Sequence, residues 1–122
     1  MKWNLIDWGE TRNKIKLNSL QKESIDLNKN NFNRNISIAM KNEMANVDYY
    51  SSAIKKDKEM VELRGKIKEN AYTKLQNGTL TATDYLTEAN AELSSRVQLE
   101  THKILLVQSI INYQLIKGDI KP

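Results

Sequence analysis

Cysteine is absent from this 122-residue sequence, and histidine, proline and glycine are scarce. Without cysteine there is no disulfide, thiolate nucleophile or cysteine-based zinc site, and a single histidine excludes a multi-histidine metal site. Four glycines and one proline are too few for the many turns of a β-sandwich or barrel. The longest apolar cluster, residues 104–107, is far shorter than the ~20 residues of a membrane span. The composition therefore predicts an all-α protein.

Charge of neither sign dominates the chain, which carries 19 Lys and Arg residues against 15 Asp and Glu residues. The two signs alternate, as in residues 55–59, whereas nucleic-acid binders usually collect Lys and Arg on one face. We therefore expect no nucleic-acid partner. No phosphate-binding glycine loop, Gly-x-Ser-x-Gly or His-Glu-x-x-His motif occurs, so the sequence predicts neither an enzyme nor a cofactor. A hydrophobic fraction of 39% favours elongated packing or packing that depends on assembly.

A helical pattern without proline or turn clusters covers residues 10–76, with apolar residues in steps of three, four or seven. A helix of this extent would be about 100 Å long at roughly 1.5 Å per residue. The asparagine-rich residues 28–35 weaken the pattern, because asparagine is a poor helix former. Residues 1–9 differ: their side chains alternate in character up to Gly9, which predicts an extended strand-to-helix segment. Within it, Trp3 and Trp8 fit either an anchor against a helix or a membrane-interface belt.

The clearest turn lies at residues 77–80. Gly78 suits the left-handed position just past a helix, and Thr81 with Asp84 matches a capping box for a second helix over 81–117. Two helices joined by so tight a turn must run antiparallel. The sequence predicts a long, coiled-coil-like antiparallel helical hairpin, with residues 10–122 as one domain.

The second helix has two apolar stripes. The first stripe contains Ala82, Leu86, Ala89, Leu93, Val97, Ile104 and Ile111, and the neighbouring stripe contains Leu99, Leu106, Ile110 and Tyr113. Because the second helix is about half as long as the first, the first part of the long helix is expected to lack a partner within the chain.

Other chemistry-bearing residues receive structural interpretations. His102 has no second histidine nearby, so we expect no metal or catalytic role for it. Glu88 and Glu92 are four residues apart without an accompanying Glu-x-x-His motif, so they are expected on a solvated or pore-facing surface.

Four segments in this order resemble the TolC-like outer membrane efflux protein family. Residues 3–9 (WNLIDWG) are similar to its passage from a barrel strand to a long helix, and residues 75–86 (LQNGTLTATDYL) are similar to its helical tip. Residues 88–93 and 108–118 are similar to the helix that follows. The resemblance covers nearly the whole chain and implies a fragment, most simply from the second of two repeats.

The resemblance also implies a function. Members of the family are homotrimeric channels in which an outer-membrane β-barrel continues as a periplasmic α-helical tunnel. They join a periplasmic adaptor and an inner-membrane pump to expel solutes. This chain would be a periplasmic part of such a protein, without a cofactor. Asp84 would also occupy a pore-lining acidic position, although Thr87, one turn further on, is not acidic. The adaptor-docking tip would comprise Asn77, Gly78, Thr79, Leu80, Thr81 and Asp84.

A second interpretation stays open from the residues themselves: a free-standing helical-hairpin or coiled-coil scaffold without a transport role.

Overall fold

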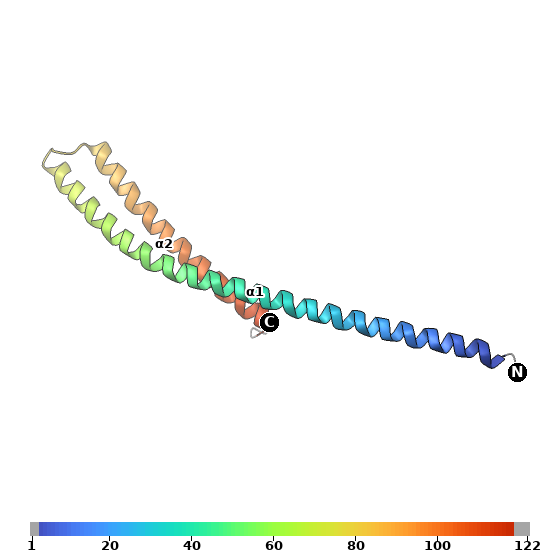
Figure 1. Cartoon of the computed structure of the whole chain (residues 1–122). Coiled ribbons are helices and arrows are strands. Elements are labelled where there is room, and N and C mark those ends of the chain that lie inside the picture. The colour runs from blue at the N-terminus through green and yellow to red at the C-terminus, as the bar shows by residue number, and fades with distance from the viewer. Residues whose placement is uncertain (1–2, 119–122) are drawn as a thin grey trace. The chain divides into compact units, whose positions relative to one another are not determined.

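The computed structural model describes residues 3–118, with side chains from residue 9 onward. It contains two helices, α1 (Trp3–Gln76) and α2 (Ala82–Lys117), and no strand within the described residues (Figure 1). The predicted all-α helical hairpin is confirmed. Neither helix, over the part described, has a stretch both long and apolar enough to cross a membrane.

The inner boundaries of the helices agree with the sequence, but the outer boundary of α1 does not. The prediction of an extended segment over residues 1–9 is corrected, because the described residues 3–9 are helical. The alternation that suggested a strand spans few residues, and no proline interrupts the chain there. The predicted roles of the Trp3 and Trp8 side chains lie outside what the structure describes.

Helix α1 also continues through its two weakest places. The asparagine-rich residues 28–35 and Gly65 are helical. Each asparagine costs a helix only about 0.5 kcal/mol relative to alanine and Gly65 about 1 kcal/mol, so strong helix formers on either side are sufficient.

Of the described residues, 3–39 belong to one compact unit and 40–118 belong to a second. In the first unit, every residue from Gly9 to Asn35 is exposed. Its apolar side chains face solvent, among them Ile15, Leu17, Leu20, Ile25, Leu27 and Phe32.

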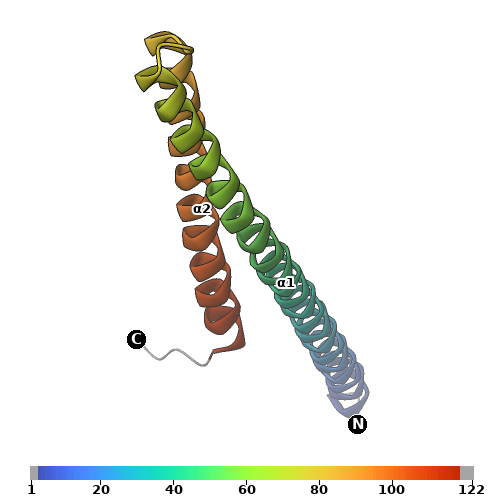
Figure 2. The same ribbon diagram turned by 90° about the vertical axis from the view of Figure 1, so that its left-hand side faces the viewer.

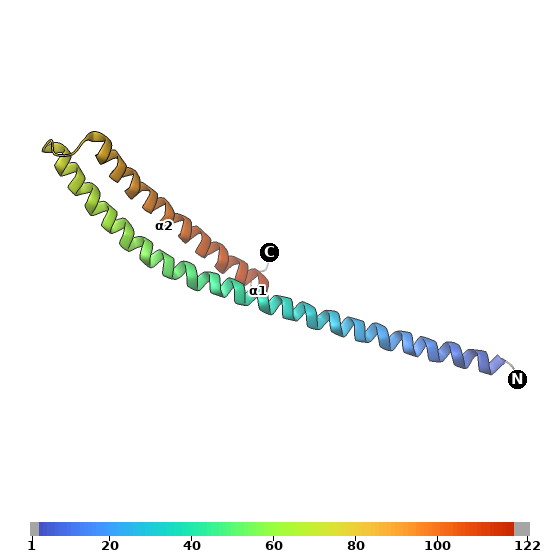
Figure 3. The same ribbon diagram turned by 45° about the horizontal axis from the view of Figure 1, so that its top comes forward.

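The second unit contains the hairpin, in which residues 40–76 of α1 run antiparallel to α2. Figures 1 and 3 show the two helices side by side from the turn onward, and Figure 2 shows that α2 is slightly inclined to α1. The contact line, called the seam below, consists of buried and half-buried residues in steps of mostly three and four, the spacing of a coiled coil. On α1 the seam contains Glu43, Val47, Tyr50, Ile54, Asp57, Val61, Arg64, Lys68, Ala71 and Leu75. On α2 it contains Tyr85, Glu88, Glu92, Ser95, Leu99, His102, Leu106, Ser109, Tyr113 and Ile116.

The seam has little apolar core. Among the described residues, Ala71 and Leu99 are the buried apolar side chains, while Asp57, Glu92 and Ser109 are equally buried. Charged and polar groups therefore share with apolar residues a seam that a free-standing hairpin would normally fill with leucine and isoleucine.

Candidate functional site

The turn between the helices has a defined backbone geometry. Gly78 adopts φ +72°, in the left-handed region. The Gly78 N–H donates to the Leu75 carbonyl at 3.0 Å, and the Thr79 N–H donates to the Lys74 carbonyl at 2.9 Å. These two bonds form a Schellman motif, which satisfies the last carbonyls of α1. The left-handed conformation predicted for Gly78 is confirmed.

The start of α2 is capped from the other side of the turn. The Asp84 N–H donates to the Thr81 hydroxyl oxygen at 3.1 Å, as a capping residue should accept. The return interaction differs from the predicted capping box. The Asp84 carboxylate accepts the Thr81 hydroxyl proton at 2.7 Å instead of bonding to a backbone amide. Both side chains therefore rigidify the same end of α2.

The structure brings the predicted tip residues together in one short, structured turn between two helix ends. Leu80 is half-buried and the others are exposed: Asn77, Gly78, Thr79, Thr81 and Asp84. Just beside the turn, the rings of Tyr72 and Tyr85 lie 5.8 Å apart and join the two helices. The tip is thus an accessible surface held in one shape.

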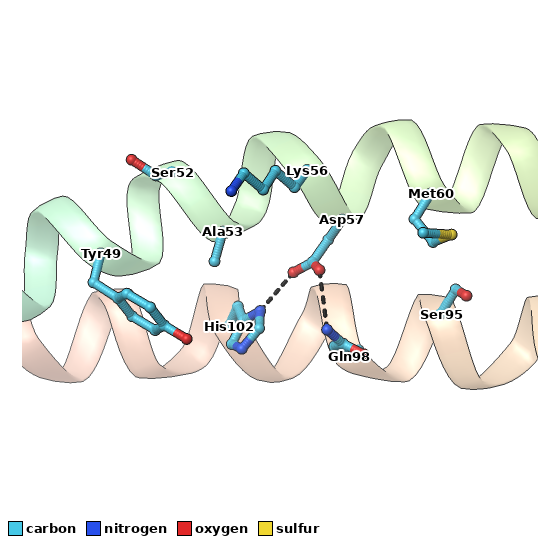
Figure 4. A pocket seen from close by; sticks show the side chains of 9 residues that line it. All are labelled: Tyr49, Ser52, Ala53, Lys56, Asp57, Met60, Ser95, Gln98 and His102. Atoms are coloured by element: carbon cyan, nitrogen blue, oxygen red, sulfur yellow. Dashed lines mark hydrogen bonds and ion pairs between the residues drawn. The ribbon is translucent and has the colours of Figure 1, made fainter.

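A second polar site lies in the middle of the seam. The His102 Nδ1 atom lies 2.5 Å from one Asp57 carboxylate oxygen, and Gln98 Nε2 donates to the other oxygen at 3.2 Å (Figure 4). Because a carboxylate only accepts hydrogen bonds, His102 donates from Nδ1. The Tyr50 ring lies 5.9 Å from the imidazole. One buried carboxylate of α1 is therefore held by two side chains of α2.

This cluster borders a groove of about 410 Å³ whose rim includes Tyr49, Lys56 and Met60. An aspartate–histidine pair can orient an imidazole for proton transfer when a nucleophile stands beside it. The two serines of the groove are not arranged in this way. Ser52 points away from His102 in Figure 4, and the Ser95 hydroxyl donates to the Ala91 carbonyl. The arrangement is suited to joining the helices in one register.

Charged residues form the next layers of the seam toward the tip. Arg64 Nη1 lies 3.6 Å from Glu88 Oε2, and Lys68 Nζ lies 3.6 Å from Glu92 Oε2. Glu92 also pairs with Arg96 on its own helix. The predicted solvated position is therefore wrong for Glu92, whereas Glu88 is half-buried. Glu92 is only 5% exposed, and both residues pair with cations of α1.

The pKa of Glu92 is lowered from its ordinary value, chiefly by the hydrogen bond from Arg96. Burial acts in the opposite direction, while the positive charges of Arg96 and Lys68 add to the lowering. The carboxylate is thus held ionised inside the seam.

No metal site accompanies these polar groups. Within residues 9–118 there is no group of three or more His, Asp or Glu side chains that could hold a metal ion.

No pattern in the sequence predicted Asp57 and Gln98 as partners of His102. A signal was present in hindsight: Gln98 and His102 are four residues apart, so they lie on one helix face. Their common partner is more than forty positions away, and no local pattern connects it to them.

The side of α2 that points away from α1 is more apolar than the side in the seam. We call this the outer face, and all of its members are exposed. It contains Leu86, Asn90, Leu93, Val97, Glu100, Ile104, Val107 and Ile111. Its six apolar side chains are between 43% and 68% exposed. An apolar face that is exposed, beside a seam with few fully buried apolar side chains, is not what a self-sufficient hairpin shows.

No protein-family model, curated protein or solved structure matches this chain.

Proposed function

We propose that this chain is a wall element of a larger helical assembly, namely part of the periplasmic tunnel of a TolC-like outer membrane efflux channel. The observation that carries the proposal is the exposed apolar outer face of α2, on a hairpin whose seam has few fully buried apolar side chains. A helix that is apolar on the side away from its partner needs a second neighbour, because exposed apolar stripes are unfavourable in water. Helices in a tunnel wall have a neighbour on each side.

The geometry of the tip supports the second part of this proposal, the assignment to an efflux channel. The Schellman motif and the Thr81 cap hold residues 77–84 in one accessible conformation, which suits a surface that docks to another protein. In the proposed channel, this tip meets the periplasmic adaptor, which links the homotrimer to the inner-membrane pump. The chain conducts solutes passively and belongs to the periplasmic part of an outer membrane protein.

One observation favours the alternative of a free-standing hairpin or scaffold protein. Residues 3–9, which resemble a passage from a barrel strand to a helix, are helical in the structure. In this alternative, the exposed apolar faces bind other helical proteins and no solute is transported.

The channel and the scaffold predict different outcomes in the cell that makes this protein, in fractionation and in dye efflux. We expect the protein to fractionate with the outer membrane, and the double substitution Gly78→Pro and Asp84→Ala to increase accumulation of a fluorescent efflux dye. Proline cannot adopt the positive φ of Gly78, so the tip changes shape while the seam is untouched.

The matched control is Gly65→Ala, which lies inside α1 with no atom within 4 Å of an added Cβ. This variant should keep normal dye efflux, and native gels should show the same trimer for both variants. A cytoplasmic protein, or normal efflux from the tip variant, would contradict the channel.

A further inference from the structure

The outer face of α2 has a regular spacing. Its members follow one another in alternating steps of four and three residues from Leu86 to Ile111, which is the spacing of a coiled-coil contact. Two of its members are polar, Asn90 and Glu100, and Ser95 is their midpoint. About Ser95, Leu93 also mirrors Val97 and Leu86 mirrors Ile104, so residues 86–104 of the face have a centre there.

We propose that a second copy of this chain binds the outer face, with the two α2 helices antiparallel about a two-fold axis at the level of Ser95. In this register Asn90 of each copy faces Glu100 of the other copy, so the contact occurs twice. Leu86 faces Ile104, and each Leu93 faces a Val97. Within residues 86–104, polar residues meet polar residues and apolar residues meet apolar residues, whereas Val107 faces Thr83 and Ile111 lies opposite the turn.

The groups needed for the polar contact are available. The Glu100 side chain is 63% exposed, and its Oε1 atom accepts from Lys103 at 2.7 Å, which leaves the other carboxylate oxygen to accept a bond. Within the part of the chain that the structure describes, the Asn90 amide has no hydrogen-bond partner. An amide opposite a carboxylate supplies the donor that the carboxylate requires.

The surroundings of the face agree with the same register. Arg96 and Lys103 flank it, and the residues opposite them are Ser94 and Thr87, so no like charges meet. At the centre the surface is hollowed, and the hollow is lined by Leu93, Ser94, Val97, Gln98 and Thr101. The Leu93 and Val97 side chains of a second copy would occupy this hollow, as knobs fit into holes in a coiled coil.

This pairing uses the face that a neighbouring helix of the tunnel would cover. The dimer is therefore expected only when no such neighbour is bound. It does not rest on the proposed function.

The first test is the molecular mass of the purified 122-residue chain, measured by analytical ultracentrifugation over a concentration series. We expect a concentration-dependent dimer. The double substitution Leu93→Glu and Val97→Glu should raise its Kd at least about tenfold, because it puts carboxylates into the apolar contact.

The matched control places the same charges on the other exposed apolar region, by Leu20→Glu and Leu27→Glu. These residues are 61% and 57% exposed, close to the values for Leu93 and Val97. The control should dimerise like the parent chain. A monomeric parent, or a dimer lost only in the control, would overturn the proposal and leave the efflux test unaffected.

The register has its own test, because the chain contains no cysteine. Asn90→Cys combined with Glu100→Cys should give a covalent dimer on a non-reducing gel. Within one copy these positions are about 15 Å apart along the helix, too far for a disulfide. Asn90→Cys combined with Val107→Cys should give much less covalent dimer. A stronger cross-link from this second pair would overturn the register.

Discussion

At the residue scale, Gly78 in the turn and Gly65 in α1 have backbone conformations with opposite preferences for a side chain. Gly78 ends the helix at φ +72°, a conformation that side chains disfavour. Gly65 lies in the helix interior, where glycine is less favourable than alanine. An added Cβ meets no atom within 4 Å at either position, so only the backbone differs between them.

We therefore predict that Gly78→Ala lowers the free energy of unfolding by about 1 kcal/mol, because alanine resists the left-handed conformation. Gly65→Ala should raise it by about 0.5–1 kcal/mol, since alanine is the better helix former. Urea unfolding followed by circular dichroism measures both. Equal signs for the two variants would contradict the geometry of the turn.

Glu92 gives a second prediction at this scale. Because its pKa is lowered in the folded chain, Glu92 stabilises the fold above its ordinary value of 4.5. That contribution is lost as the pH falls through the folded pKa. We expect the melting temperature to fall below about pH 4.5, and Glu92→Gln to flatten this part of the profile.

The control for this profile is Glu62→Gln. The Glu62 pKa is also lowered, by an exposed pair with Lys66, and exposed pairs contribute little to stability. An unchanged acid profile in Glu92→Gln would show that the seam does not hold this carboxylate ionised.

At the element scale, polar pairs join the two helices of the hairpin in addition to apolar packing. Asp57 accepts bonds from both Gln98 and His102 across the seam. A buried carboxylate without partners is unfavourable, so every shift of α2 along α1 that separates these groups is penalised. The cluster thus selects one register for the helix pair.

A double-mutant cycle on Asp57→Asn and His102→Leu tests this role. We expect a coupling free energy of about 0.5–3 kcal/mol, the range for residues in one hydrogen-bond network. The exposed pair of Glu62 and Lys66, treated in the same way, should show little coupling. Additive effects at Asp57 and His102 would contradict a shared role in setting the register.

At the scale of the whole molecule, the two units differ in how much of their surface is covered. Residues 9–35 are all exposed, whereas residues 43–116 supply the seam. Helical hydrogen bonds without tertiary packing open easily, because most helix stability in proteins comes from packing.

Hydrogen–deuterium exchange on the dilute chain should therefore separate the units. Amides of residues 10–35 should exchange much faster than those of residues 50–70, as measured by mass spectrometry of peptides. If both regions were protected equally, the first unit would have a covering partner even in dilute solution.

The sequence alone determined the local features of this protein. The end of α1 at Gln76, the left-handed Gly78, the Thr81 cap and the end of α2 at Lys117, just before Gly118, all follow from residues within about five positions of each other. Capping and turn formation need no distant partner, so spacing and residue type suffice.

Tertiary structure decided which side of α2 faces inward. Both apolar stripes are visible in the sequence, but the one through Leu86, Leu93 and Ile104 is exposed, and the one through Leu99 and Leu106 enters the seam. That choice depends on α1, which presents Asp57, Arg64 and Lys68 to side chains of α2 that match them in charge and hydrogen bonding. Complementarity between residues more than twenty positions apart is a property of the pair of helices, and no periodicity within one helix contains it.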